Sequence, residues 1–332
     1  MKITFFSAKP YDKASFNKQN EQFGFELEYY ETHLGPHIIN AVEKTDAVCV
    51  FVNDRVNAPV IETLARKGVK VIALRCAGFN NVDLQAAKAN GIKVCRVPAY
   101  SPEAVAEHAV AMLLTLNRKT HKAYNRVREQ NFSLNGLLGF DVHHKTVGVV
   151  GTGNIGKAFC KIMVGFGCKV IANDVVANKE LEGLGVQFVS LPEILKQSDI
   201  ISLHCPLNDQ THHIVNDNSI SWVKKGVMLI NTSRGGLIDT KSVIDALKSK
   251  QIGYLGIDVY EQEEKLFFRD LSANIIEDDT IQRLMSFPNV LVTAHQAFFT
   301  AEALQQIADV TLNNINDLIS GEKLVNSAAQ LT

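Results

Sequence analysis

The stretch TVGVVGTGNIG, residues 146–156, decides the fold class of this 332-residue chain. Its first five residues have the apolar character of a buried strand, and glycines follow at positions 151, 153 and 156. The next residues, KAFCKIMVGFG, have the pattern of a helix. A strand, a Gly-x-Gly-x-x-Gly turn and a helix in this order predict the first βα turn of a doubly wound parallel sheet.

The three glycines have separate tasks in such a turn. Gly151 permits the tight bend, Gly153 lets a pyrophosphate approach the backbone, and Gly156 lets the helix pack on the sheet. The free N–H groups of the helix N-terminus suit phosphate oxygens. Asp174, at the end of the next expected strand, would accept hydrogen bonds from ribose hydroxyls and repel a 2′-phosphate. The pattern therefore predicts NAD rather than NADP, the alternative being a glycine-rich turn without a ligand.

Strand-like runs continue to the end of this half of the chain. They alternate with amphipathic stretches and lie at residues 169–174, 186–190, 199–206, 226–231, 253–260 and 290–295. Repeated βα units of this kind predict a parallel sheet covered by helices. We expect about six strands in it.

The first hundred residues show the same alternation without sharing the sequence. Strands are expected at 3–6, 26–30, 47–52, 69–74 and 93–97, which predicts a separate parallel sheet. Residues 101–130 then run as one long helix or two in succession, starting at Ser101 and Pro102. A last amphipathic helix follows Thr300.

Composition restricts the classes of function. Hydrophobic residues make up 46% of the chain, enough for two domains, and the net charge of −1 gives no reason to expect nucleic acid or an anionic membrane as partner. No apolar run reaches the ~18 residues of a membrane span, and the N-terminus does not read as a signal peptide. Six scattered cysteines without a C-x-x-C pair favour buried thiols over disulfides or a metal site. We therefore expect a cytoplasmic enzyme or binding protein that holds no metal.

Three later strand ends carry reactive side chains. Arg234 in LINTSRGGLID suits two-point binding of a carboxylate, and His295 in VLVTAHQAFF can exchange protons near neutral pH. Between them, GIDVYEQEE holds Asp258, Glu261, Glu263 and Glu264. Each could be an ordinary surface charge. Their order after a complete fingerprint is what favours a catalytic site.

These motifs together resemble the D-2-hydroxyacid dehydrogenase family. The resemblance rests on GTGNIG, HCPL, NTSRGGLID, DVYEQE and AHQAF in that order, with RCAGFNNVD and PAYSPEAVAEHA upstream. It covers essentially the whole chain. NTSRG with its flanking residues is a specific signature, whereas Gly-x-Gly-x-x-Gly alone is not.

The resemblance implies two domains with the active site in the cleft between them. A flavodoxin-like substrate domain would comprise residues 1–100 and 300–332, and a Rossmann NAD domain residues 101–299. The family roles fall on Arg234 for the substrate carboxylate, His295 as proton donor and Glu263 as its partner. Glu263 would orient the imidazole and favour its charged form. Glu261 and Glu264 remain alternatives for that partner.

The resemblance also assigns the binding residues. Cofactor contacts are expected from the glycine turn and from Asn154, Ile155, Asp174, Cys205, Pro206, Thr211, Thr232, Ser233 and Asp258. Substrate contacts are expected from Ala77, Gly78, Tyr100 and Phe298, together with Arg234 and His295.

The implied reaction is reduction of a small 2-keto acid by NADH, with pyruvate as the expected substrate and D-lactate as its product. Phenylpyruvate, hydroxypyruvate and glyoxylate are alternative substrates. A phosphoglycerate enzyme is disfavoured by the lack of a regulatory domain, and a formate dehydrogenase by the acidic partner for histidine. An NAD(H)-sensing protein without catalytic activity is an alternative from another class. By analogy with the family, a homodimer or homotetramer is expected.

Overall fold

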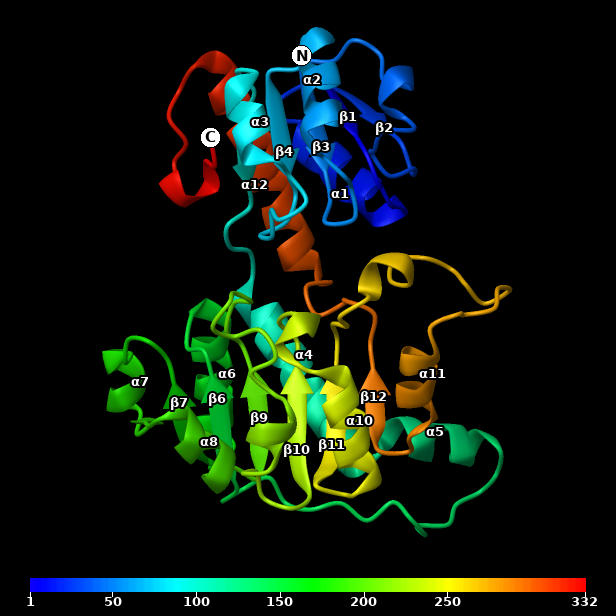
Figure 1. Ribbon diagram of the computed structural model, residues 1–332, viewed down its shortest axis with the longest axis vertical. Coiled ribbons are helices and arrows are strands. Elements are labelled where there is room, and N and C mark those ends of the chain that lie inside the picture. Colours follow the sequence, from blue (N-terminus) through cyan, green and yellow to red (C-terminus); the bar gives the residue numbers. More distant parts are fainter. The chain divides into compact units, whose positions relative to one another are not determined.

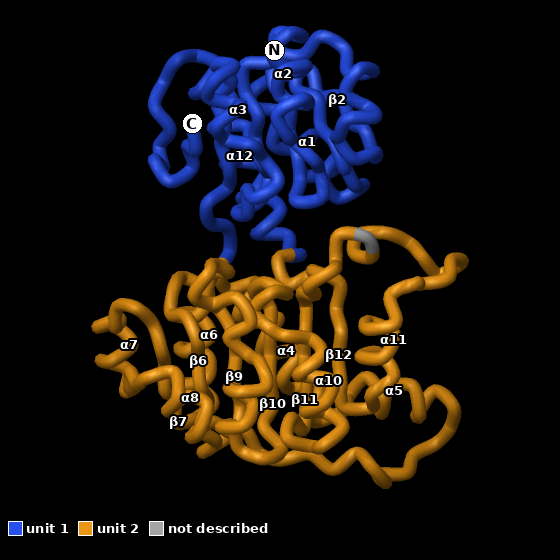
Figure 2. Tube along the Cα trace, in the orientation of Figure 1, with its two compact units in different colours: residues 1–101, 299–332 blue, residues 102–298 orange. Residues whose placement is uncertain are grey.

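The computed structural model describes residues 1–264 and 266–332, which divide into two compact units. Unit 1 comprises Met1–Ser101 and Phe299–Thr332, and unit 2 comprises Pro102–Phe298 (Figure 2). The chain therefore passes between the units twice, at residues 101–102 and again at 298–299.

Unit 1 is built on a five-stranded parallel sheet in the order β2-β1-β3-β4-β5. Its strands are β1 (Lys2–Phe5), β2 (Glu26–Tyr29), β3 (Ala47–Val50), β4 (Val71–Leu74) and β5 (Lys93–Arg96). This is the strand order of flavodoxin-like folds. The central strands AVCV and VIAL are buried at every residue, as strands covered by helices on both faces must be.

The helices of unit 1 begin at recognisable caps. They are α1 (Pro10–Asn20), α2 (Ala58–Arg66), α3 (Leu84–Ala89) and α12 (Ala301–Ser320), with 3₁₀ turns at Ile39–Ala41 and Ser327–Ala329. The Thr300 side chain accepts a hydrogen bond from the Ala303 N–H at the start of α12. That helix ends at Gly321, whose φ of 82° is the left-handed conformation common at helix ends. The C-terminal segment thus completes a unit that the N-terminus begins.

Unit 2 contains a seven-stranded parallel sheet in the order β12-β11-β10-β9-β6-β7-β8. The strands are β6 (Thr146–Val150), β7 (Lys169–Asn173), β8 (Gln187–Phe188), β9 (Ile200–Leu203), β10 (Val227–Asn231), β11 (Ile252–Ile257) and β12 (Val290–Val292). The sheet has one strand more than the expected six, and its edge strand β8 has only two residues. The fold class expected from the sequence, two doubly wound parallel sheets, is confirmed.

Helices cover both faces of this second sheet (Figure 1). The helices of unit 2 are α4 (Pro102–Arg118), α5 (Thr120–Arg128), α6 (Asn154–Gly165), α7 (Lys179–Gly183), α8 (Leu191–Gln197), α9 (Asp217–Ile220), α10 (Thr240–Lys248) and α11 (Asp279–Ser286), with 3₁₀ turns at Gly235–Leu237 and Glu263–Lys265. Lys119 has a φ of 51°, which interrupts the helical path. Residues 101–130 therefore form two helices in succession and not one.

The strand order of unit 2 reverses between β6 and β9. From β6 the chain runs outward to β7 and β8, and then returns to β9 on the other side of β6. Open parallel sheets bind ligands at such a reversal, beyond the carboxyl ends of the strands. Gly151 follows β6 at this point, and Cys205 follows β9.

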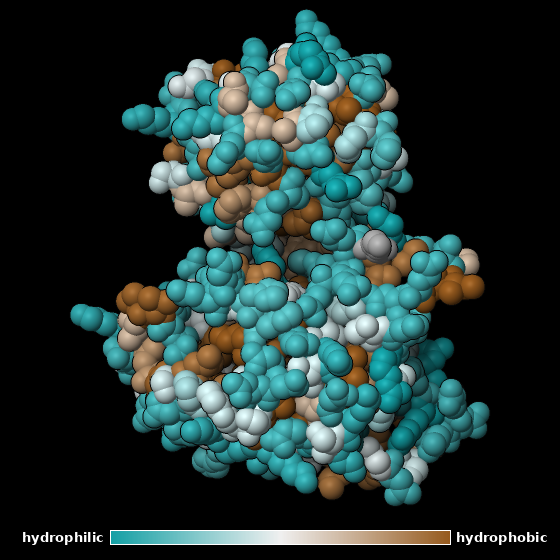
Figure 3. Space-filling view, in the orientation of Figure 1, coloured by the Kyte–Doolittle hydropathy of each residue, from teal (hydrophilic) through white to brown (hydrophobic). Residues whose placement is uncertain are grey.

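The described surface and thiols add two observations. Hydrophilic residues predominate on the face drawn in Figure 3, and apolar residues form separate patches there. None of the described helices has the length and apolar character needed to cross a membrane. None of the six cysteines, each of them described, forms a disulfide, and five are buried.

Candidate active site

The fingerprint turn is packed too tightly at two of its glycines for any other residue. A Cβ on Gly151 would lie 2.5 Å from the Cys205 nitrogen, and Gly151 itself has a φ of 92°. A Cβ on Gly156 would lie 2.0 Å from the Gly151 carbonyl oxygen. Gly153, by contrast, faces open space and precedes α6 without a side-chain cap. The turn therefore leaves room for a phosphate at the start of α6, where the first N–H groups of a helix have no partner within the helix.

Asp174 follows β7 and carries a charged carboxylate. Its Oδ2 accepts hydrogen bonds from the Thr152 N–H (2.5 Å) and hydroxyl (2.8 Å), and its Oδ1 accepts one from the Val175 N–H at 2.7 Å. Burial alone would raise the pKa of Asp174, but these hydrogen bonds outweigh burial and lower it. The carboxylate is thus fixed beside the glycine turn with its negative charge retained.

A buried asparagine shapes the turn that carries Arg234. The amide of Asn231, at the end of β10, donates to the Arg234 carbonyl oxygen (2.9 Å) and accepts from the Ser233 N–H (3.0 Å). The Ser233 hydroxyl donates to the Cys205 carbonyl oxygen at 2.8 Å, which joins this turn to the end of β9. The Thr232 hydroxyl is buried and has no hydrogen-bond partner among the described residues.

Arg234 itself is exposed at the carboxyl edge of the sheet. Its Nη1 donates to the Ser233 carbonyl oxygen at 2.8 Å, and within the described part of unit 2 it forms no ion pair. A Cβ on the next residue, Gly235, would lie 2.2 Å from the Tyr260 carbonyl carbon. The Arg234 turn therefore packs directly on the turn that follows β11. Its guanidinium retains donors for an anionic ligand.

His295 and Glu263 form a hydrogen-bonded pair at this same edge. The imidazole Nδ1 lies 2.9 Å from Glu263 Oε1, and Glu263 Oε2 accepts the Tyr260 N–H at 3.0 Å. Both side chains are 21% exposed. The Phe268 ring packs against the imidazole with centroids 5.6 Å apart. With Nδ1 engaged and the carboxylate fixed, Nε2 is the ring nitrogen available to a substrate.

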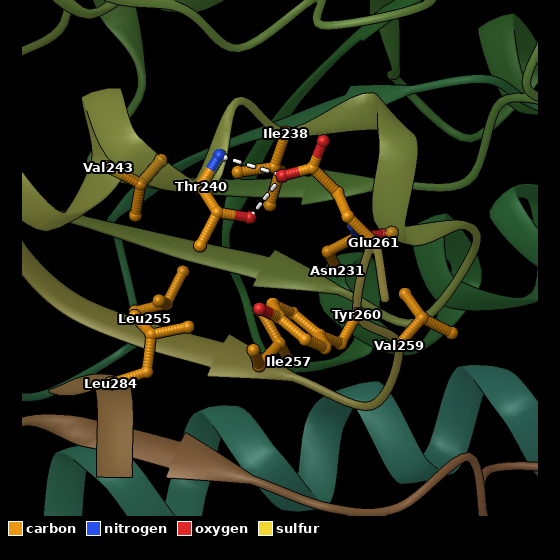
Figure 4. A pocket seen from close by; sticks show the side chains of 11 residues that line it. Asn231, Ile238, Thr240, Val243, Leu255, Ile257, Val259, Tyr260, Glu261 and Leu284 are labelled. Carbon is orange, nitrogen blue, oxygen red and sulfur yellow. Dashed lines mark hydrogen bonds between the residues drawn. The ribbon is translucent and has the colours of Figure 1, made fainter. Parts of the chain in front are cut away.

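Glu261 is committed to a different pair. Its Oε1 lies 2.7 Å from His213 Nε2, and its Oε2 accepts hydrogen bonds from both the N–H and the hydroxyl of Thr240. Figure 4 shows the Glu261 carboxylate directed at Thr240 across a small pocket beside the ends of β10 and β11. Glu264 is exposed. Of the three glutamates, only Glu263 contacts His295.

The backbone of His295 is held in a strained conformation by Asp258. His295 has a φ of 52°, which costs a non-glycine residue about 1–2 kcal/mol. Its N–H donates to the Asp258 carbonyl oxygen at 2.7 Å. The next two N–H groups, of Gln296 and Ala297, each donate to an oxygen of the Asp258 carboxylate at 2.9 Å. The two successive N–H groups that donate to the carboxylate form an anion-binding backbone turn of the kind called a nest.

The remaining residues expected near the cofactor lie around the end of β9. Cys205 is buried against Gly151, and Pro206 is exposed after it. The Thr211 hydroxyl donates to the Pro206 carbonyl oxygen at 2.6 Å, closing a short loop. These three residues, the glycine turn and the Arg234 turn thus lie at neighbouring strand ends of one sheet.

The residues expected to meet the substrate are divided between the units. Ala77 and Gly78 follow β4 in unit 1, where the Ala77 carbonyl oxygen accepts a hydrogen bond from Arg96 at 2.8 Å and the Gly78 carbonyl oxygen one from the Cys76 thiol at 3.3 Å. Tyr100 belongs to unit 1 and Phe298 is the last residue of unit 2. Their roles remain predictions.

Sequence reasoning missed several residues that shape the site. Asn231 orders the Arg234 turn, Phe268 packs on His295, and His108 on α4 contacts Thr293 and Asp258. Only His108 left a signal, as a lone histidine within the apolar helical run AVAEHAVAMLL. Nothing local marks Asn231 or Phe268, because their roles depend on contacts distant in sequence.

The residues present fit an NAD cofactor. Gly153 leaves open space at a helix N-terminus, the charged Asp174 stands at the adjacent strand end, and the unpaired Thr232 hydroxyl lies at the end of β10. A fingerprint turn, an arginine and a histidine–glutamate pair along one sheet edge are the features of a nicotinamide-dependent dehydrogenase.

Comparison with known proteins gives the family. Residues 110–297 match the NAD binding domain of the D-isomer specific 2-hydroxyacid dehydrogenases. The chain is 56% identical to 2-hydroxyacid dehydrogenase homolog 1 of Schizosaccharomyces pombe over 96% of this chain and 97% of that protein. It is 52% identical to D-lactate dehydrogenase of Escherichia coli, covering 98% and 99% of the two chains. A solved structure concerning the pyruvate reductase of Chlamydomonas reinhardtii is similar with a TM-score of 0.93 at 47% identity, covering 98% of both chains.

The chain therefore belongs to the D-isomer specific 2-hydroxyacid dehydrogenase family, and it is an NAD-binding oxidoreductase.

Proposed function

We propose that this enzyme reduces pyruvate to D-lactate with NADH. The observation that carries the proposal is the His295–Glu263 pair at 2.9 Å, on the same sheet edge as the exposed Arg234 and the glycine turn. Relatives named D-lactate dehydrogenase and pyruvate reductase, similar over almost the whole chain, support the choice of substrate.

Each of the three side chains has a distinct task in this proposal. Bound NADH would supply a hydride to the substrate C2. Arg234 binds the carboxylate through its planar fork and polarises the neighbouring carbonyl. His295 delivers a proton from Nε2 to the carbonyl oxygen, and Glu263 balances the imidazolium charge and prevents the ring from turning. Charge prepared in this way contributes about 3–4 kcal/mol to transition-state stabilisation per donor.

Unit 1 would complete the site as the substrate domain. We assign residues 1–100 and 300–332 to it, and residues 101–299 to the NAD domain. The backbone N–H groups near Ala77 and Gly78 would meet the substrate carboxylate, while Tyr100 and Phe298 would border its side chain. An apolar border of this kind suits the methyl group of pyruvate.

A panel of 2-keto acids with NADH and with NADPH tests the proposal. Pyruvate should give the highest kcat/KM, and the product should be the D isomer on chiral chromatography. If the preferred substrate were phenylpyruvate, hydroxypyruvate or glyoxylate, the proposed reduction of a 2-keto acid would stand but its substrate would not be pyruvate. Binding of NADH without turnover of any keto acid would favour the sensing alternative.

Two variants test the residue roles. His295→Ala should reduce turnover by about 10²–10⁴-fold while leaving NADH binding intact, because the proton donor is lost. Arg234→Lys should raise the KM for pyruvate and lower kcat, because lysine lacks the planar fork. Rates near those of the parent in either variant would contradict the assigned role.

We also propose that the protein forms a homodimer or homotetramer in a cytoplasmic, reducing compartment. Unit 2 exposes apolar side chains on α5 and the segment after it, namely Tyr124, Val127, Phe132, Leu134 and Leu138. Clustered exposed apolar residues are typical of interfaces, and free thiols suit a reducing compartment. Light scattering should show an oligomer that Leu134→Glu weakens, and cell fractionation should recover the enzyme with cytosolic markers.

A further inference from the structure

His108 lies on α4, outside the residues to which a task in the reaction is assigned. Its Nε2 is 3.1 Å from the Thr293 hydroxyl oxygen and 3.6 Å from Asp258 Oδ1, and its side chain is 16% exposed. The three residues come from a helix and from the segments after β11 and β12. This contact thus joins α4 to the turn that carries His295.

The hydrogen-bond geometry fixes the direction of this chain of contacts. The Thr293 hydroxyl has one proton and lies 2.6 Å from Asp258 Oδ1, whereas the two other possible acceptors, His108 Nε2 at 3.1 Å and the Met112 sulfur at 3.8 Å, are farther away. A short bond to a buried carboxylate is much stronger than a long one to a thioether. The proton therefore points to Asp258, so Thr293 can only accept from His108, whose Nε2 must carry a hydrogen.

Asp258 depends on these donors because its carboxylate is buried. Its side chain is 1% exposed, and burial would raise its pKa, yet hydrogen bonds from His108, Thr293, Ala297 and Gln296 lower it. The charged carboxylate is what binds the N–H groups of Gln296 and Ala297 next to the strained His295. Weakening the hydrogen bonds that His108 and Thr293 make to Asp258 should therefore loosen the turn that carries His295.

We infer that His108 is a positioning residue for the proton donor, acting through Thr293 and Asp258 to hold the His295 turn. This inference rests on the proposed role of His295. His108 need not touch the substrate or the cofactor. It also anchors α4, where the chain enters unit 2, to the segment through which the chain leaves it at Phe298.

Three variants of the full-length enzyme test the inference. His108→Phe keeps an aromatic ring without the donor and should lower kcat for pyruvate about tenfold, with the Kd for NADH changed less than twofold. His108→Gln can still donate to Thr293 and should recover most of the rate. Thr293→Val should lower kcat to a similar extent, and the double variant His108→Phe with Thr293→Val should lose little more than either alone.

A structural readout accompanies the kinetics. Hydrogen–deuterium exchange of the peptide containing residues 293–298 should rise in His108→Phe and return toward the parent in His108→Gln. The inference would be overturned if His108→Phe had the kcat and the exchange of the parent. It would equally be overturned if the rate losses of the two single variants multiplied in the double variant, or if His108→Gln did not recover the rate. If His108→Phe does not fold, Thr293→Val alone must show both the slower kcat and the faster exchange.

His295→Ala, measured in parallel, separates this inference from the proposed function. If His295→Ala keeps its turnover, the proposed proton donor is wrong. If His295→Ala is inactive while His108→Phe behaves as the parent, the function stands and only the role of His108 is refuted.

Discussion

The Nδ1 atom of His295 lies 2.9 Å from Glu263 Oε1, although 32 residues separate the two in the chain. The other carboxylate oxygen of Glu263 accepts the Tyr260 N–H, so this side chain has little freedom to leave the imidazole. Glu261, two residues earlier, is engaged with His213 and Thr240 instead. The structure thus separates two neighbouring glutamates by their partners, and this separation can be measured.

Glu263→Gln should lower kcat for keto-acid reduction by about 10- to 100-fold, because the amide cannot balance the charge of an imidazolium. Glu261→Gln is the matched control, and steady-state kinetics of both variants provide the measurement. We expect Glu261→Gln to lower Tm by a few degrees, since it weakens contacts to the start of α10, with kcat changed less than threefold. The reverse ranking of the two kcat values would assign the histidine partner to Glu261.

The glycine turn supports a prediction that separates folding from cofactor binding. Gly153→Ala places its Cβ in open space at a φ of −60°, so the variant should fold with a Tm close to that of the parent. The added methyl group should nevertheless occupy the space left for a pyrophosphate and raise the Kd for NADH at least tenfold. Fluorescence titration with NADH and thermal unfolding measure the two effects.

Gly156→Ala is the contrasting variant. Its Cβ would lie 2.0 Å from the Gly151 carbonyl oxygen, which is backbone and cannot move aside cheaply. We expect a large loss of stability or of soluble protein. Equal Tm values for the two alanine variants would contradict the packing described for this turn.

The sequence was sufficient for the fold because its signals are local. Alternating strand and helix patterns, and the glycine spacing at 151–156, predicted both parallel sheets. Each strand of the second sheet overlaps a stretch expected from the sequence, and even the two-residue edge strand β8 lies within the expected range 186–190. The break at Lys119 was left open because the helical pattern continues through it.

The site was predictable only in part. Arg234 and His295 were recognisable because each follows a strand in a distinctive motif, but the choice among three acidic residues in EQEE depends on where each side chain points. The Asp258 nest and its link to His108 depend on contacts between segments about 35 to 185 residues apart. No periodicity encodes such contacts, so these supporting residues appeared only in the structure.

Asp174→Ala should change the cofactor preference. The negative charge of Asp174, maintained by the Thr152 and Val175 hydrogen bonds, would repel the 2′-phosphate of NADP. Its removal should raise the ratio of kcat/KM with NADPH to that with NADH by about tenfold. We expect kcat/KM with NADH to fall because the ribose loses its hydrogen-bond acceptor, and kcat/KM with NADPH to rise because the 2′-phosphate is no longer repelled. Asp199→Ala, a carboxylate paired with Lys224, serves as the control and should leave the ratio unchanged. An unaltered ratio in Asp174→Ala would remove this residue from cofactor discrimination.

His204, after β9, should make stability depend on pH. Its Nε2 is 2.8 Å from the Ser202 hydroxyl and its ring packs on Phe159, and burial lowers the pKa of His204 well below the ordinary value of 6.5. Between the folded and unfolded pKa values the unfolded chain binds one more proton, so folding stability falls as pH drops below about 6.5. The loss is at most about 1.4 kcal/mol per pH unit from this group.

The His204→Asn variant should therefore lose about 1 kcal/mol less than the parent between pH 7.0 and 5.5 in urea unfolding. The control variant His37→Asn, at an exposed position, should lose as much stability as the parent over this pH range. If His204→Asn also lost as much as the parent, His204 would bind its proton equally well in the folded and the unfolded chain.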